Sequence, residues 1–220
     1  MAAASTALPV VVLVSGQGSN LQAMIDKAAA LHVDVRAVIS DRAAAPALER
    51  ARSAGIPTEV LSPQAYPDRD EYDAALMAAV EAYRPGLVVL AGFMRILGPG
   101  FVRHYAGRLL NIHPSLLPKY RGLHTHRRVL EAGDPRHGCS VHFVTDELDG
   151  GAVVAQGEVA VKKGDDEHAL RVRVQALEHV IYPEVVGWYA AGRLRLEGGH
   201  AVLDGAPLAM PKMLHWQEKG

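Results

Sequence analysis

The chain has 220 residues, is 49% hydrophobic and carries a formal net charge of -1. Its length suits one substantial core, and its composition excludes an intrinsically disordered chain. The balanced charge lacks the basic excess of a nucleic-acid-binding surface. A single cysteine, Cys139, excludes a disulfide framework and fits a reducing cytosol.

The N-terminal residues do not read as a targeting signal. Residues 1–8 are small and apolar but carry no basic segment, which predicts a flexible tail rather than a signal peptide. Uninterrupted apolar runs stay below the roughly 18 residues of a membrane span. We therefore expect a cytoplasmic protein with neither a membrane nor a nucleic acid as its partner.

The first half of the chain alternates predicted strands and helices. Strands are predicted at 8–16, 33–40, 58–61, 86–92 and 107–113, and helices at 19–32, 45–55 and 69–85. Several strands are continuous β-branched runs, which is typical of parallel strands buried on both faces. Such alternation predicts an open α/β sheet with right-handed crossovers.

The pattern changes after residue 136. Two alternating runs, 138–145 and 152–161, predict neighbouring antiparallel strands around an acidic turn. A long helix follows at 166–192, with a bend expected at Pro183, and then a hairpin at 193–205. The tail after 205 shows no clear element. The predicted fold is thus α/β, with an open, mostly parallel twisted sheet, helices on both faces and a C-terminal antiparallel part.

A glycine loop joins the first predicted strand to the first helix. Gly16 and Gly18 allow a sharp turn, and the amides of Gly18, Ser19 and Asn20 would point from the helix N-terminus at an anion. A dinucleotide fingerprint needs glycine where Leu21 stands, and a Walker loop needs Gly-Lys-Ser/Thr. The loop therefore predicts a monophosphate site, with a ligand-free tight turn as the alternative.

Asn111 and His113 form the first candidate catalytic group, together with Asp149. The first two face the same side at the carboxyl end of a predicted parallel strand, where ligands gather in such sheets. An amide can stabilise an oxyanion, an imidazole can move a proton, and a carboxylate can orient the imidazole. Because no activated serine or cysteine accompanies them, we expect direct acyl transfer between two bound substrates. A purely structural polar pair is the alternative at each position.

A histidine-rich segment raises the question of a metal. His113, His124 and His126 lie close in sequence, with His137 and His142 further on. Their spacing lacks the helical i, i+4 pair of zinc motifs, and no Cys-x-x-Cys accompanies them. We expect no metal here.

Four stretches resemble one known family. They are VLVSGQGSNLQAMID, VVLAGFMRIL, HYAGRLLNIHPSLLPKYRGLHTH and GCSVHFVTDELDGG. Together, in this order, they are similar to glycinamide ribonucleotide formyltransferases, the folate-dependent enzymes of de novo purine synthesis. The resemblance runs from about residue 9 to residue 192.

The resemblance implies a role for each matching position. It makes Asn111, His113 and Asp149 catalytic. The phosphate and ribonucleotide side would be formed by Gly18, Ser19, Asn20 and Glu178, with Lys119 as a possible neighbour of the phosphate. The folate side would be formed by Arg69, Met94, Arg95, Ile96, Leu97, Val144, Thr145, Asp146 and Glu147.

The implied reaction moves a formyl group from 10-formyltetrahydrofolate, a co-substrate, to the amine of glycinamide ribonucleotide, without a metal. Asn111 and protonated His113 would stabilise the tetrahedral oxyanion, and Asp149 would help to pass a proton to the leaving nitrogen. The single domain 1–220 would comprise a tail at 1–8, a phosphate-binding half at 9–110, a catalytic and folate-binding half at 111–192, and a hairpin and tail at 193–220. A monomer or homodimer is expected.

Arg121 departs from the family pattern, because other members often carry proline there. Arg-Gly at this place resembles methionyl-tRNA formyltransferase, whereas the following LHTH resembles the glycinamide enzyme. The tRNA enzyme would need a basic C-terminal domain, and a formyltetrahydrofolate hydrolase an N-terminal regulatory domain, for which we expect no room. A non-catalytic folate or phosphoribosyl sensor is the third alternative, and a nicotinamide dehydrogenase is disfavoured by Leu21.

Overall fold

The structure is a computed structural model that describes residues 7–214. The tail expected at 1–8 lies outside the described residues except at its end, where Leu8 already begins the first strand. Residues 215–220 of the C-terminal tail also lie outside them.

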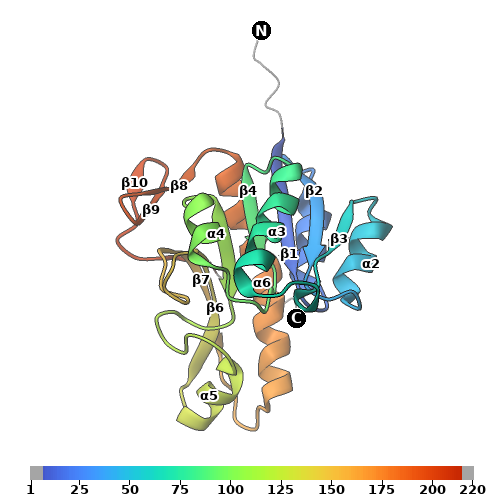
Figure 1. The fold of residues 1–220 in the computed structure, drawn as a ribbon. Helices are drawn as coiled ribbons and strands as arrows, with labels where there is room; N and C mark the ends of the chain where they lie inside the picture. Colours follow the sequence, from blue (N-terminus) through green and yellow to red (C-terminus); the bar gives the residue numbers. More distant parts are fainter. Residues whose placement is uncertain (1–6, 215–220) are drawn as a thin grey trace.

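Eight strands of the described chain form one mixed sheet, in the order β11-β7-β6-β5-β4-β1-β2-β3 (Figure 1). The strands are β1 (Leu8–Val14), β2 (Val33–Ser40), β3 (Thr58–Val60), β4 (Leu87–Leu90), β5 (Leu109–His113), β6 (Arg136–Phe143), β7 (Val153–Ala160) and β11 (Lys212–Leu214). Strands β1 to β5 pair in parallel, and β6 runs antiparallel to both β5 and β7. The predicted mostly parallel α/β sheet is confirmed.

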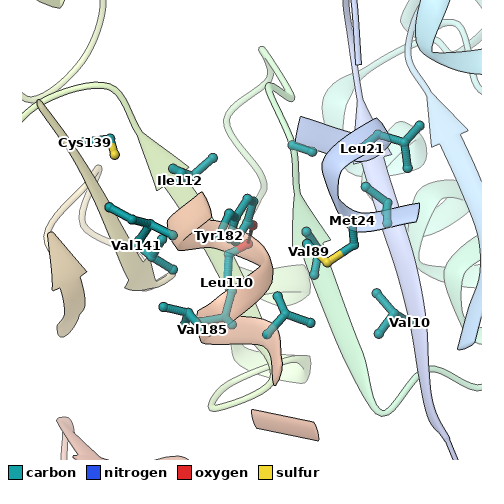
Figure 2. Packing of buried hydrophobic residues seen from close by; sticks show 14 of the residues in the cluster. Val10, Leu21, Met24, Val89, Leu110, Ile112, Cys139, Val141, Tyr182 and Val185 are labelled. Carbon is teal, nitrogen blue, oxygen red and sulfur yellow. Dashed lines mark hydrogen bonds between the residues drawn. The ribbon is translucent and has the colours of Figure 1, made fainter. Parts of the chain in front are cut away.

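Helices cover both faces of this sheet. They are α1 (Ser19–Lys27), α2 (Pro46–Ser53), α3 (Arg69–Ala82), α4 (Pro99–His104), α5 (Thr125–Ala132) and α6 (Glu167–Ala190), with a 3-10 turn at Pro63–Ala65. Side chains of β1 alternate between the faces, as the two-residue period of a strand requires. Val10 and Val12 pack with α1, α2 and α6, whereas Val11 and Leu13 pack with α3 and α4. Figure 2 shows part of the apolar cluster that contains Val10, in which the Met24 side chain of α1 faces the strands.

Two helices and two strands occur where no element was predicted. Helix α4 is six residues long, and α5 follows a segment rich in proline and glycine, so neither has enough sequence for a clear period. Strand β11, in the tail expected to hold no element, adds to the sheet edge by pairing in parallel with β7. Strand β10 (Ala206–Pro207) pairs with β9. These short helices and strands form because they pack against or pair with other elements, and their local sequence alone does not predict them.

The predicted antiparallel part is present in the structure. Strands β8 (Leu194–Glu197) and β9 (His200–Leu203) form a hairpin whose turn is Gly198–Gly199. Both glycines have positive φ, 55° and 81°, which a two-residue type I′ turn requires. Helix α6 continues through Pro183, and the bend expected there stays a prediction. Among the described helices, none is both long and apolar enough to cross a membrane.

Candidate active site

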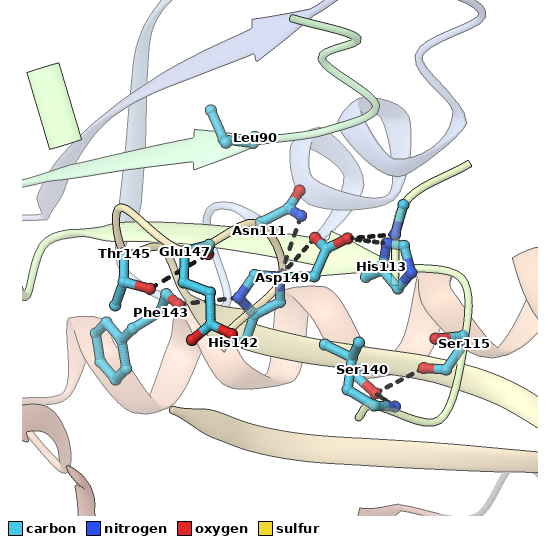
Figure 3. A network of polar contacts seen from close by, with 12 residues as sticks. Leu90, Asn111, His113, Ser115, Ser140, His142, Phe143, Thr145, Glu147 and Asp149 are labelled. Atoms are coloured by element: carbon cyan, nitrogen blue, oxygen red, sulfur yellow. Dashed lines mark hydrogen bonds and ion pairs between the residues drawn. The ribbon is translucent and has the colours of Figure 1, made fainter. Parts of the chain in front are cut away.

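The structure brings Asp149 to the carboxyl-terminal part of β5, which carries Asn111 and His113 (Figure 3). His113 Nδ1 lies 3.3 Å from Asp149 Oδ2, although the two residues are about 36 positions apart in the sequence. Asp149 lies in the loop between β6 and β7, and its positive φ of 50° turns the chain sharply there. Both side chains are about nine-tenths buried, so water screens their interaction weakly.

Both ring nitrogens of His113 face oxygen acceptors. Nε2 lies 2.9 Å from the Tyr120 carbonyl oxygen, and Nδ1 faces the Asp149 carboxylate. Either neutral tautomer would point one nitrogen lone pair at an oxygen, whereas the imidazolium satisfies both contacts. Burial nevertheless holds the pKa of His113 below its ordinary value, and the Tyr120 carbonyl and Asp149 only partly offset this. A lowered pKa means that His113 gives up its proton more readily than a free imidazole does.

Asp149 is held as a carboxylate by its surroundings. Its Oδ2 accepts a hydrogen bond from the Gly122 amide at 2.9 Å, and its Oδ1 lies 3.6 Å from His142 Nε2. Burial alone would raise its pKa, but His142, the Gly122 amide and His113 outweigh it, so that the pKa lies below the usual value. The site thus presents a fixed negative charge behind the imidazole.

His142 belongs to this network and was considered in the sequence only as a metal candidate. It lies directly opposite Asn111 in the antiparallel β5–β6 pair, and its Nε2 is 3.2 Å from Asn111 Nδ2. Its Nδ1 is 2.9 Å from the Phe143 carbonyl oxygen, and its Nε2 faces both the Asn111 amide and Asp149 Oδ1. This contact orients Asn111 and engages one of its two amide hydrogens, which leaves the other for a ligand.

Ser115 and Cys139 cannot serve as nucleophiles in this arrangement. Ser115 is fully buried and donates to the Lys119 carbonyl oxygen at 2.7 Å. Cys139 is also fully buried, and burial raises the pKa of its thiol well above the usual value. Ser140 accepts from the Leu117 amide and donates to the Ser115 carbonyl oxygen, which fastens the loop after His113.

The predicted phosphate loop forms the N-terminus of α1. Gly18 is the residue before the helix and has a φ of 72°, and Ser19 and Asn20 begin the helix. A Cβ at Gly18 would lie 2.6 Å from Ala47 Cβ, so glycine is also needed to let α2 approach. The first amides of a helix have no intrahelical partner and suit an anion. The turn therefore has both a packing role and anion-binding geometry.

Asn20 contacts Glu178, which lies far away in sequence on α6. Asn20 Nδ2 donates to Glu178 Oε2 at 2.8 Å. Glu178 is 6% exposed, and burial raises its pKa to about 7 against the opposing hydrogen bond from Asn20. Asn20 Oδ1 is buried and finds no hydrogen-bond partner within residues 7–214. Two residues predicted for the ribonucleotide side are thus in direct contact, with an unmet acceptor between helices.

A cavity of about 510 Å³ opens beside this loop. It lies between α1, α2 and α6, and Ser19, Lys27, Arg50 and His179 are among the residues that line it. Arg50 also donates to the Gln17 carbonyl oxygen at 2.8 Å, which places its guanidinium across the glycine loop. The cationic side chains make this end of the site suited to an anionic group.

The predicted folate residues come together on the opposite side, after β4 and β6. Arg69 donates to the Ile96 carbonyl oxygen at 2.9 Å, and Arg95 stacks on the Tyr72 ring at 4.7 Å. Leu97 is buried in the same cluster against which Val144 packs. The 94–97 segment and the start of the 144–147 loop therefore pack against one apolar cluster.

Exposed apolar side chains surround this region. Met94 is 61% exposed, Ile96 is 65% exposed, and Leu148 is 52% exposed. The Thr145 hydroxyl donates a hydrogen bond to the Glu147 carbonyl oxygen within the loop. The Asp146 carboxylate lies 3.8 Å from the Arg103 guanidinium, and the Glu147 carboxylate forms an ion pair with Arg121. Exposed apolar groups beside polar backbone suit a flat, partly apolar ligand.

Two further histidines, His126 and His137, contact each other, and Lys119 has an acidic partner. His126 Nδ1 and His137 Nε2 lie 2.9 Å apart, and Lys119 pairs with Asp134 at 3.0 Å while mostly exposed. Across residues 7–214, no group of three or more His, Cys, Asp or Glu side chains is arranged to hold a metal ion.

Comparison with known proteins points to one family. Residues 8–186 match the formyl transferase family. Phosphoribosylglycinamide formyltransferase of Escherichia coli (strain K12) is 59% identical over 201 residues, which cover 90% of this chain and 95% of that protein. Trifunctional purine biosynthetic protein adenosine-3 of Drosophila pseudoobscura pseudoobscura is 46% identical over 190 residues, which cover 84% of this chain and 14% of that protein.

The fold agrees with this similarity. A solved structure of the phosphoribosylglycinamide formyltransferase from Coxiella burnetii matches with a TM-score of 0.90 at 50% identity, over 94% of this chain and 99% of that one. The resemblance predicted from the four sequence stretches is confirmed, and the chain belongs to the formyl transferase family.

Proposed function

We propose that the protein transfers the formyl group of 10-formyltetrahydrofolate to the amine of glycinamide ribonucleotide, a step of de novo purine biosynthesis. The observation that carries this proposal is the buried network of Asn111, His113 and Asp149 between an anion-binding loop and a rim of exposed apolar side chains. Two substrates with these chemical characters would meet at the network.

The ribonucleotide would lie along α1. Its phosphate would accept from the amides of Gly18, Ser19 and Asn20, and its glycinamide side would approach Glu178. The folate would lie against Met94–Leu97 and Val144–Glu147, with Arg69 and Arg95 nearby. Its formyl carbon would then face the end of β5.

The amine attacks the formyl carbon directly, and the carbonyl oxygen becomes an oxyanion. The free amide hydrogen of Asn111 donates to that oxygen. The protonated form of His113 stabilises the same charge, and its burial makes this interaction strong. Asp149 favours that protonation and helps to pass a proton, through water, to the leaving nitrogen of the folate.

We further propose that the protein works in the cytoplasm as a monomer or homodimer. One cysteine among 220 residues suits a reducing compartment. Both substrates are small molecules, and the sequence has no basic excess for a nucleic acid.

An acceptor comparison tests the function. The purified protein is mixed with 10-formyltetrahydrofolate, and the deformylated folate is followed with glycinamide ribonucleotide, with methionyl-tRNA, or with no acceptor. Turnover with the ribonucleotide alone is expected, and His113→Ala is the inactive control. Turnover without an acceptor would instead identify a hydrolase, turnover with tRNA a tRNA formyltransferase, and folate binding without turnover a sensor.

A further inference from the structure

Three consecutive residues, Tyr120 to Gly122, hold both members of the His113–Asp149 pair. The Tyr120 carbonyl oxygen accepts from His113 Nε2 at 2.9 Å, and the Gly122 amide donates to Asp149 Oδ2 at 2.9 Å. Because these backbone groups are only two residues apart, the orientation of this segment determines the orientation of both side chains.

The segment needs support from outside itself. Tyr120 has a φ of 55° and Gly122 a φ of 78°. A non-glycine residue in the left-handed region is uncommon and persists only when its surroundings hold it there. The contacts of residues 120–122 with neighbouring elements therefore decide whether the segment keeps this conformation.

One side of the segment is fastened to the region of α5. The Tyr120 hydroxyl donates to Asp134 Oδ2 at 2.7 Å, and the guanidinium of Arg128 lies 5.3 Å from the centre of the Tyr120 ring. Arg128 also donates to the Arg121 carbonyl oxygen at 2.6 Å. These contacts use the Tyr120 side chain and the Arg121 carbonyl oxygen, and none of them engages the Arg121 guanidinium.

The other side is fastened by Arg121 itself. Its guanidinium forms an ion pair with the Glu147 carboxylate in the loop that carries Asp149. Glu147 lies tightly over Gly150, since a Cβ at that glycine would be 2.4 Å from Glu147 Cδ. The ion pair therefore connects the two loops that contribute the partners of His113.

We propose that the Arg121–Glu147 ion pair is a positioning contact that holds the Tyr120–Gly122 segment against the 144–150 loop and so orients His113 and Asp149 for the transfer step. The inference rests on the proposed function. Arg121 is 39% exposed and Glu147 is 65% exposed, so water and salt weaken the pair. Because exposed pairs couple weakly, we expect the loss of this one to lower the rate by no more than about two- to fivefold.

A double-mutant cycle in the full chain tests this role. Arg121→Met and Glu147→Gln are each expected to lower kcat about two- to fivefold, with KM for glycinamide ribonucleotide unchanged. The double variant should lose no more than either single variant, because one contact is removed in all three. The exchanged pair, Arg121→Glu with Glu147→Arg, should recover most of the lost rate.

Arg193→Met is the matched control. It breaks an exposed ion pair with Asp204, at 2.7 Å, in the C-terminal hairpin. Its kcat should equal that of the unmodified protein. Raising the salt concentration should lower kcat of the unmodified protein towards that of Arg121→Met and should change the variants little.

Additive losses in the double variant would overturn the proposal. So would a rise in KM for folate at unchanged kcat, since that would assign Arg121 and Glu147 to ligand binding. A second measurement does not depend on turnover: exchange of the Gly122 amide hydrogen, followed by NMR, should be about two- to fivefold faster in Arg121→Met. Unchanged exchange would contradict the proposal even if the proposed reaction were wrong.

Discussion

His113 and His142 lie on either side of the Asp149 carboxylate, yet their hydrogen bonds give them different tasks. The two nitrogens of His113 face a carbonyl and a carboxylate, which suits a ring that gains and loses a proton. His142 has Nδ1 beside the Phe143 carbonyl oxygen and Nε2 beside both the Asn111 amide and Asp149, which suits a ring that orients its neighbours. Identical residue types are thus distinguished only by what each nitrogen contacts.

Asp149→Asn is expected to reduce kcat by about 10²- to 10⁴-fold while both substrates still bind. The carboxylate raises the pKa of His113 against the effect of burial, so its loss lowers that pKa. The limb of the pH–rate profile that reports on His113 should therefore move to lower pH. Steady-state kinetics from pH 5 to 9, roughly, together with equilibrium binding, check this. Full turnover in the variant would remove Asp149 from the mechanism.

Glu178→Gln is expected to change how stability depends on pH. Burial raises the pKa of Glu178 to about 7 from 4.5, so the folded protein keeps a proton that the unfolded chain releases. Unfolding between these pH values releases that proton, and stability therefore falls as pH rises through the window. The loss amounts to about 3 kcal/mol.

The Glu178→Gln variant has no such proton to release, so its free energy of unfolding should not fall in this way. The difference in unfolding free energy, variant minus unmodified protein, should therefore increase from pH 4.5 to pH 7. Urea unfolding at several pH values measures the difference. Glu184→Gln, at an exposed position on the same helix, is the control. A constant difference across the pH range would mean that Glu178 is ionised in the folded protein.

The glycine loop before α1 shows how one element serves packing and binding together. Gly18 combines a positive φ with close contact to Ala47, and it also begins the helix whose amides face the proposed phosphate. Gly16 lies two residues earlier. Its φ is not positive, and a Cβ there would meet open space, so neither the backbone conformation nor packing requires glycine. The spacing of glycines in the sequence does not reveal this difference.

Gly18→Ala is expected to destabilise the protein by about 1–3 kcal/mol, because a Cβ there meets Ala47 and the backbone is left-handed. Gly16→Ala should change stability by less than about 0.5 kcal/mol. Urea unfolding of both variants tests the contrast. Equal destabilisation would show that neither the positive φ of Gly18 nor its contact with Ala47 sets the requirement for glycine.

Across the whole molecule, α6 connects the strands that carry the site. The Tyr182 hydroxyl lies 2.9 Å from the carbonyl oxygens of both Leu90 and Leu110. Leu90 is the last residue of β4, and Leu110 lies within β5. Figure 2 shows Tyr182 among the core side chains. The same helix places Glu178 against Asn20. One helix thus links the sheet core to the ribonucleotide side.

Tyr182→Phe is expected to lower the free energy of unfolding by about 1–3 kcal/mol, because it removes the single buried hydroxyl proton that the Leu90 and Leu110 carbonyl oxygens share. Tyr189→Phe is the comparison, since its hydroxyl contacts a single carbonyl, that of Gly107, at 3.2 Å in a partly buried place. Chemical denaturation should show the larger loss for Tyr182. No loss in that variant would mean that the bridging contact is energetically neutral.

The sequence by itself determined the alternation of strands and helices, the glycine loop, and the placement of Asn111 and His113 on one side of a strand end. Each of these follows from local periodicity or from the conformational needs of single residues. The resemblance to formyltransferases added Asp149, Glu178 and the folate-side residues.

Only the tertiary structure decided which of these residues meet. Asn20 contacts Glu178, and His142 contacts Asn111. The antiparallel register of β5 and β6 places His142 opposite Asn111, and no local pattern encodes that register. Helix α5 and strand β11 likewise form because distant strands and helices cover them. Contacts across a sheet depend on crossovers and register, which arise from the packing of the whole chain.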